Sequence, residues 1–164
     1  MLAGVALGRR DAKAAEASIA QAHKAAVTNG WAMLLAWARV LSARLKVLRY
    51  LERRDTLDPS RSKNDFLAAL DALEDHSTAW SEELDPGEVY ALYAAVQRLT
   101  GQGAAAKTTL ERAARLVPKE NVVSHRSLAV GRAFVDGAGF EDALAWFDAR
   151  GYARLVAWWR ALAA

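Results

Sequence analysis

Cysteine is absent from the 164-residue sequence, which excludes disulfide bonds and thiolate metal sites. Proline occurs only at Pro59, Pro86 and Pro118, and each stands where the apolar periodicity of the chain breaks. No stretch reaches the roughly 18 uninterrupted apolar residues that a membrane-spanning helix needs. β-branched residues never alternate with polar residues as they do in strands. These absences predict an all-α protein with no membrane segment, and the lack of cysteine fits a reducing compartment such as the cytoplasm.

The sequence is otherwise that of an ordinary folded domain. It is 53% hydrophobic and 25% charged, and much of the apolar share is alanine, which loses no side-chain entropy in a helix. The first eight residues lack the basic start and the cleavage site of a signal peptide, so none is expected. The length fits one domain over residues 1–164. A net charge of +3 permits acidic partners without demanding nucleic acid.

Start and stop signals divide the chain into helices joined by turns. Asn29-Gly30 and residues 137–139 are turn signals. Asp85, Pro86 and Glu88 have the pattern of an N-cap, a first-turn proline and a capping-box acid. The expected helices cover residues 1–9, 11–28, 31–54, 64–78, 86–100, 103–117, 121–136, 140–150 and 152–163.

Apolar spacing predicts which helix faces turn inward. The helix over 31–54 carries an apolar seam, because apolar residues recur every seven positions. The seam comprises Trp31, Leu34, Ala38, Leu41, Leu45 and Leu48. The inward residues expected from 64–78 are Phe66, Leu67, Leu70 and Leu73. Those expected from the last helix are Tyr152, Leu155, Val156, Trp159 and Leu162.

Two helix pairs repeat one arrangement of small and bulky residues. Positions 94, 106 and 110 hold Ala, Ala and Leu, and positions 131, 143 and 147, each 37 residues later, hold Gly, Ala and Phe. Phe134 adds an aromatic residue near the end of a first helix. This pattern resembles the tetratricopeptide repeat, in which small residues let paired helices approach closely. The resemblance implies antiparallel helical hairpins stacked as a short right-handed superhelix, with 152–163 as a C-terminal capping helix.

The resemblance covers residues 88–150 well and residues 1–80 loosely. The helix over 31–54 is longer than the helices of the family, and the loop after it is not a tight turn. Over-long hairpins of this kind are familiar from large bacterial regulators and kinases. The first repeat starts partway through its first helix, which is expected either of a fragment of a longer protein or of a natural cap.

The resemblance also implies a binding groove along the first helix of each pair. The residues expected to face it are Arg39, Ala91, Ala95, Arg98, Leu99, His125, Leu128, Arg132 and Val135. Three arginines beside small and apolar residues suit an acidic or C-terminal segment of a protein partner. The polar residues of the family's carboxylate-binding members are missing, since Ala91 and Leu128 stand where they are needed. The alternative is that the arginines are simply solvated.

A basic stripe of Arg39, Lys46, Arg49 and Arg53 offers a second interpretation, because such a stripe can contact nucleic-acid phosphates. Pairing of the stripe with the acidic stretch over 65–88 is the stronger alternative. Near the C-terminus, Trp158 and Trp159 are neighbours about 100° apart on a helix, so one must leave the shared face. An exposed tryptophan there would mark a docking or homodimer surface.

No catalytic constellation stands out. His23, His76 and His125 lack metal-ligand spacing, and the S-x-x-K match at 60–63 has none of its companion motifs. We therefore expect no catalytic residue, metal or cofactor. The leading hypothesis is a protein-interaction module of a bacterial regulatory or signalling protein, and the alternative is a nucleic-acid-binding helical protein using the 39–53 stripe.

Overall fold

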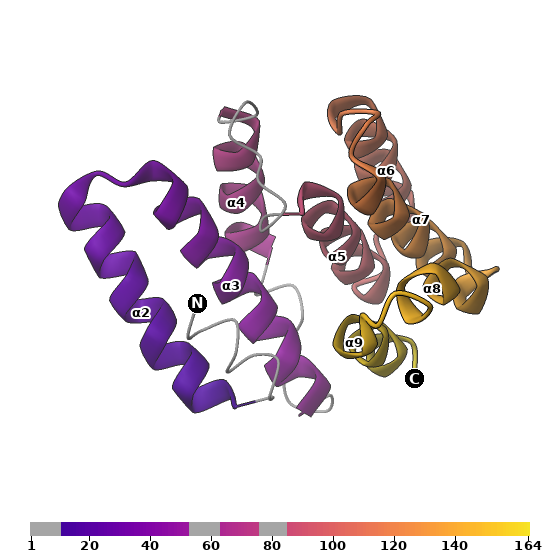
Figure 1. Cartoon of the computed structure of the whole chain (residues 1–164), viewed down its shortest axis with the longest axis horizontal. Helices are drawn as coiled ribbons and strands as arrows, with labels where there is room; N and C mark the ends of the chain where they lie inside the picture. The colour runs from indigo at the N-terminus through magenta and orange to yellow at the C-terminus, as the bar shows by residue number, and fades with distance from the viewer. Residues whose placement is uncertain (1–10, 53–62, 76–84) are drawn as a thin grey trace. The chain divides into compact units, whose positions relative to one another are not determined.

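The computed structural model describes residues 11–52, 63–75 and 85–164, and within them all regular structure is helical (Figure 1). The chain divides into two compact units, Met1–Leu84 and Asp85–Ala164. The all-α prediction is therefore confirmed for the described part of the chain. The helix expected over 1–9 lies outside the described residues. Among the described helices, none has the length and apolarity that a membrane crossing requires.

The first unit contains α2 (Ala12–Asn29), α3 (Ala32–Glu52) and α4 (Lys63–Asp75). Asp11 caps α2, because its carboxylate accepts a hydrogen bond from the Ala14 amide at 3.0 Å. Gly30 ends α2 in the left-handed region at φ 66°, as the turn signal predicts. The helix α3 packs against both α2 and α4. Its buried residues are Ala36, Ala38, Val40, Leu41, Ala43, Leu45 and Val47.

Two inward positions predicted for this unit are wrong. Trp31 is 55% exposed, because it stands in the turn before α3 and its amide binds the carbonyl of Ala26. Leu67 is 38% exposed, whereas its neighbour Phe66 is fully buried, as expected for residues a quarter-turn or more apart. The side chains of Leu48 and Leu73 lie outside the described residues.

The second unit runs through five helices in chain order. They are α5 (Pro86–Leu99), α6 (Gly103–Leu116), α7 (Val122–Asp136), α8 (Phe140–Asp148) and α9 (Ala153–Ala163). Each helix packs against its successor, and α5 also packs along α7 (Figure 1). The two hairpins α5–α6 and α7–α8 are therefore laid against each other through their first helices.

Glycine permits the close contact between α5 and α7. A Cβ added at Gly131 would stand 2.8 Å from the Cβ of Ala91 and 3.1 Å from a methyl group of Leu110. At Gly87 an added Cβ would stand only 2.1 Å from the carbonyl oxygen of Ser124. The sequence predicts a small residue at 131 correctly, but the side chains that fill this notch are Ala91 and Leu110.

Phe134, the aromatic residue near the end of this first helix, contacts other rings. Phe134 packs against Phe140 and Trp159, with ring centroids 6.1 and 5.9 Å away. The Phe140 and Trp159 rings are themselves 6.4 Å apart in an edge-on arrangement. This aromatic trio joins α7, α8 and α9. Phe147 is fully buried and makes edge-on contacts with Trp146 and Tyr152.

Asp85 occupies the N-cap position of α5, as predicted, but its side chain does not cap that helix. The two carboxylate oxygens instead accept hydrogen bonds from the hydroxyls of Ser124 and Ser127, each at 2.5 Å. Both serines are buried on α7. Instead of a local cap, the Asp85 carboxylate therefore links the start of α5 to the first two turns of α7.

Candidate functional site

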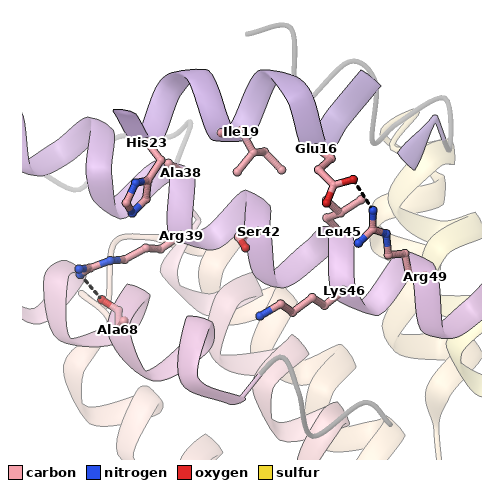
Figure 2. Close-up of a pocket in the computed structure, with 11 residues that line it drawn as sticks. Glu16, Ile19, His23, Ala38, Arg39, Ser42, Leu45, Lys46, Arg49 and Ala68 are labelled. Carbon is pink, nitrogen blue, oxygen red and sulfur yellow. Dashed lines mark hydrogen bonds and ion pairs between the residues drawn. The ribbon is translucent and has the colours of Figure 1, made fainter. Parts of the chain in front are cut away.

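A pocket of about 370 Å³ opens between α2 and α3, with one residue of α4 at its edge (Figure 2). We call it the α2–α4 pocket. Its lining residues are Glu16, Ile19, Ala20, His23, Ala38, Arg39, Ser42, Leu45, Lys46, Arg49 and Ala68. The α3 members recur every three or four residues, which places them on one helix face. Both its volume and its mixture of aliphatic and polar lining are typical of small-molecule sites.

Cations dominate the polar lining of this pocket. Arg39, Lys46 and Arg49 are basic residues, and Glu16 is the one carboxylate among the lining residues. Arg49 binds Glu16 in an ion pair of 2.5 Å, and Arg39 donates a hydrogen bond to the carbonyl oxygen of Ala68 at 3.3 Å (Figure 2). Each of these two guanidinium groups is thus held in place by a partner on another helix.

For one member of the basic stripe, Arg49, the partner differs from the one expected. The sequence favours pairing of the stripe with the acidic stretch over 65–88, but the partner of Arg49 is Glu16 on α2. Arg53 lies outside the described residues. The three described members of the stripe, Arg39, Lys46 and Arg49, do line one pocket, as their spacing on α3 indicates.

A second hollow, of about 520 Å³, lies in the other unit and contains two residues of the predicted groove. Arg98 and Leu99 stand at the end of α5, beside half-buried Phe134 and Phe140. We call this the Phe134 pocket. Its complete lining is Arg98, Leu99, Ala133, Phe134, Gly137, Phe140, Leu162 and Ala163. Arg98 is its one charged residue and is exposed, so the hollow combines an apolar floor with a single cation.

A third hollow, of about 250 Å³, contains Arg132 and Val135. It lies where α6 and α7 meet, and the remaining lining residues include Leu110 and Glu111. Lys107 and Asp136, which also line it, form an exposed ion pair of 2.9 Å across the two helices. Arg98 and Arg132 therefore line different hollows and do not share one.

Four apolar residues expected in the groove are buried: Ala91, Ala95, Leu128 and Val135. Ala91 is turned toward Gly131 in the contact between α5 and α7, so its side chain serves packing. His125 is half-buried, and its Nε2 lies 3.1 Å from the carbonyl oxygen of Pro118. Because a carbonyl only accepts, Nε2 carries the hydrogen and the ring is tied to the α6–α7 loop.

The two tryptophans expected at a docking surface differ in exposure. Trp159 is fully buried in the aromatic trio, so it belongs to the core and presents no surface to a partner. Trp158 is half-buried, and its indole Nε1 donates no hydrogen bond to any residue that the structure describes. The prediction that one of the neighbours leaves the shared face is consistent with this difference.

Few titratable groups in the described residues have a shifted pKa. A hydrogen bond from Arg160 lowers the pKa of the exposed Glu141 carboxyl below its ordinary value of 4.5. The same contact raises the pKa of Arg160. Burial raises the pKa of the Tyr93 phenol, and its hydrogen bond with Gln97 opposes that shift. None of these three groups lines any of the three hollows. Within the described ranges no three His, Asp or Glu side chains gather as metal ligands would.

Sequence reasoning missed several residues that complete the pockets. Glu16, His23 and Ala68 reach the α2–α4 pocket from other helices, and no local pattern links them to α3. Ser42 was available as a signal, because it stands between Arg39 and Lys46 on the same helix face. Phe140 reaches the Phe134 pocket from the first turn of α8, and the sequence did not indicate which residues its ring would contact.

No protein-family model matches the chain, and no curated protein or solved structure matches it either.

Proposed function

We propose that the chain is a non-catalytic protein-interaction module whose hairpins stack in the manner of tetratricopeptide repeats. The packing of α5 against both α6 and α7, and of α7 against α8, supports this arrangement because stacked hairpins make such contacts. The proposed setting is a regulatory or signalling protein of a bacterial cytoplasm, an inference from composition and the lack of cysteine.

The observation that carries the proposal is the Phe134 pocket. Its floor is apolar and partly aromatic, and it is large enough to receive one or two apolar side chains of a partner. Arg98 at the rim is exposed and has a guanidinium that suits a carboxylate. A partner segment with an apolar residue beside an acidic residue is therefore complementary to this hollow in both shape and charge.

The test is capture of partners from an extract of the source organism by the immobilised chain. A partner bound by the wild-type chain should be lost with Arg98→Glu, because the substitution sets like charges against each other at the rim. Arg115→Glu is the matched control, since Arg115 is an exposed arginine of α6 outside the three hollows. Equal capture by all three proteins, with unchanged circular dichroism, would count against the proposal.

A second candidate function is nucleic-acid binding through α3. The specific observation in its favour is that Arg39, Lys46 and Arg49 lie along one face of that helix. Such binding should weaken steeply with added salt, because each phosphate contact releases counterions. A binding constant that is flat between about 50 and 200 mM salt would exclude it.

A further inference from the structure

Two arginines stand over one tryptophan where the first turns of α7 meet the end of α8. The guanidinium carbon of Arg126 lies 5.7 Å from the centre of the Trp146 ring, and that of Arg150 lies 4.0 Å from it. Both arginines are exposed, and Trp146 is half-buried. We call these three residues the Trp146 surface. Because a cation is attracted to the face of an indole ring, Trp146 holds both guanidinium groups close to itself.

Both guanidinium groups keep hydrogen-bond donors for a ligand. In the part of the chain that the structure describes, neither Arg126 nor Arg150 forms an ion pair. Arg150 donates one hydrogen bond, from Nη1 to the carbonyl oxygen of Trp146 at 3.2 Å. A guanidinium carries several N–H groups, so most of them remain available. Asp142, one turn before Trp146 on α8, is exposed and pairs with neither arginine.

The shared ring limits how far apart the two cations can be. Their guanidinium carbons are separated by no more than the sum of their distances to the ring centre. Residues three or four positions apart on a helix have Cβ atoms about 5–6 Å apart, and residues two positions apart in an extended segment are about 6.5 Å apart. Both spacings lie within that limit. One partner segment can therefore bring a carboxylate to each arginine, and each pair can form two parallel hydrogen bonds.

The surroundings of the two arginines are open and partly apolar. The three hollows described above include no residue of the Trp146 surface, so this surface suits a macromolecule better than an enclosed small molecule. Val122, one turn before Arg126, is 54% exposed. Tyr152, whose ring packs edge-on against Phe147 beside Trp146, is 43% exposed. Tryptophan, tyrosine and arginine are the residues that most often dominate the binding energy of protein interfaces.

The arrangement disfavours nucleic acid as the occupant. The bases of a single strand bind mainly by stacking on an exposed aromatic face. The Arg150 guanidinium, 4.0 Å from the ring centre, already covers a face of Trp146 that a base would need. A carboxylate needs only outward N–H groups of an arginine, and stacking on a ring leaves those groups accessible.

We propose that the Trp146 surface docks an acidic segment of a partner protein, with one of two neighbouring carboxylates bound to each arginine. Arg126 lies in the second turn of α7, whereas Phe134 lies in its last turn. The Trp146 surface is therefore separate from the Phe134 pocket, and binding to it does not depend on the partner proposed for that pocket.

Nuclear magnetic resonance titration of the full ¹⁵N-labelled chain with short peptides tests the proposal. One peptide carries two glutamates four residues apart in a helix-forming sequence, and another carries two glutamates separated by one residue in an extended sequence. Each has a counterpart with glutamine at both positions. The readout is the indole N–H signal of Trp146, assigned with Trp146→Phe. We expect saturable shifts with at least one diglutamate peptide and none with its glutamine counterpart.

Variants localise the binding. Arg126→Gln and Arg150→Gln should each weaken binding of the diglutamate peptide by about threefold or more, the size expected of an exposed ion pair. Arg132→Gln is the matched control and should bind as the wild-type chain does, because Arg132 is an exposed arginine of the same helix that lines the hollow between α6 and α7. Arg98→Glu should also leave this binding unchanged, which separates it from binding at the Phe134 pocket.

Several results would overturn the proposal. Neither diglutamate peptide might shift the Trp146 signal, or the glutamine counterparts would shift it equally. Unchanged affinity with both Arg126→Gln and Arg150→Gln would contradict it, as would an equal loss with Arg132→Gln. Tighter binding of single-stranded oligothymidylate at the same signal would assign the surface to nucleic acid instead.

Discussion

Two glycines of the second unit should respond in opposite directions to the same substitution. Gly87→Ala places a methyl group against the Ser124 carbonyl of α7, where backbone cannot easily retreat. We expect a loss of about 1–3 kcal/mol in the free energy of unfolding, or more. Gly103→Ala meets no atom closer than 4.0 Å and should gain about 0.4–1 kcal/mol by restricting the unfolded chain. Urea denaturation of both variants measures the difference, and a shift of the same sign in both would contradict this account.

At the residue scale, the sequence predicts which residues begin and end helices better than it predicts which distant residues contact each other. Pro86 at the first turn of α5 and Gly30 at the end of α2 stand where residue preference alone places them. The Asp85 carboxylate was expected to cap its own helix. Its oxygens instead accept hydrogen bonds from the hydroxyls of Ser124 and Ser127, which lie 39 and 42 residues later in the chain. No neighbour in sequence signals a link over that distance, and so it could not be predicted.

At the scale of elements, Asp85 should contribute more to stability than an ordinary cap. Asp11 accepts one bond from its own helix, and its replacement by Ala typically costs about 0.5–2 kcal/mol. Asp85→Ala leaves two buried hydroxyls without their acceptor and should cost at least about 2 kcal/mol. A double-mutant cycle of Asp85→Ala with Ser127→Ala, followed by urea denaturation, should give a coupling of about 1 kcal/mol or more. Additive effects would show that the hydroxyl and the carboxylate do not interact in solution.

The stability that the contact between α8 and α9 contributes should depend on pH. Glu141 and Arg160 form an exposed ion pair of 2.7 Å, and the contact lowers the pKa of Glu141 below 4.5. Because the folded-state pKa is the lower one, the contribution to stability is present above pH 4.5 and is lost as pH falls through the lowered value. The melting temperature of Glu141→Gln should therefore lie below that of the wild-type chain at pH 7 and converge with it in acid.

Asp142→Asn is the control for this measurement. Asp142 is the neighbouring exposed acid in the same first turn of α8, so it experiences the same helix dipole without the Arg160 contact. A pH-dependent difference of equal size in both variants would assign the effect to the dipole instead of the ion pair.

Element boundaries were largely predictable because caps and breakers act locally. The ends of α5, α6 and α7 fall within one or two residues of those expected from Pro86, Pro118 and the Gly137 turn. Which faces meet was less predictable. Heptad spacing extended the α3 seam back to Trp31, although that residue lies in the turn before the helix.

At the scale of the whole molecule, the division into two units predicts that the second can fold by itself. Residues 85–164 have their own core, including Leu110, Phe147 and Trp159, and all five helices find packing partners within the unit. The isolated segment 85–164 should give a helical circular-dichroism spectrum and one cooperative melting transition. A non-cooperative melt would show that this unit needs the rest of the chain.

All-α character was readable from the sequence because alanine content and apolar spacing act all along the chain. One continuous groove along the first helices was harder to predict from the sequence, because it requires each of these helices to expose the expected face. Burial of Ala91 against Gly131 and separation of Arg98 from Arg132 follow from the close packing of α5 on α7. Close approach of this kind depends on glycine and alanine, and these small residues contribute little to hydrophobic periodicity.

The two-hydroxyl contact of Asp85 also bears on where this polypeptide is divided for expression. A recombinant segment that starts one residue later, at Pro86, would lack the Asp85 carboxylate that accepts hydrogen bonds from Ser124 and Ser127. It would still contain every turn of α5. The shorter product would keep every helix, yet it should be harder to purify intact and more readily digested by trypsin. The segment that begins at Asp85 should therefore be more stable against unfolding and proteolysis than the segment that begins at Pro86.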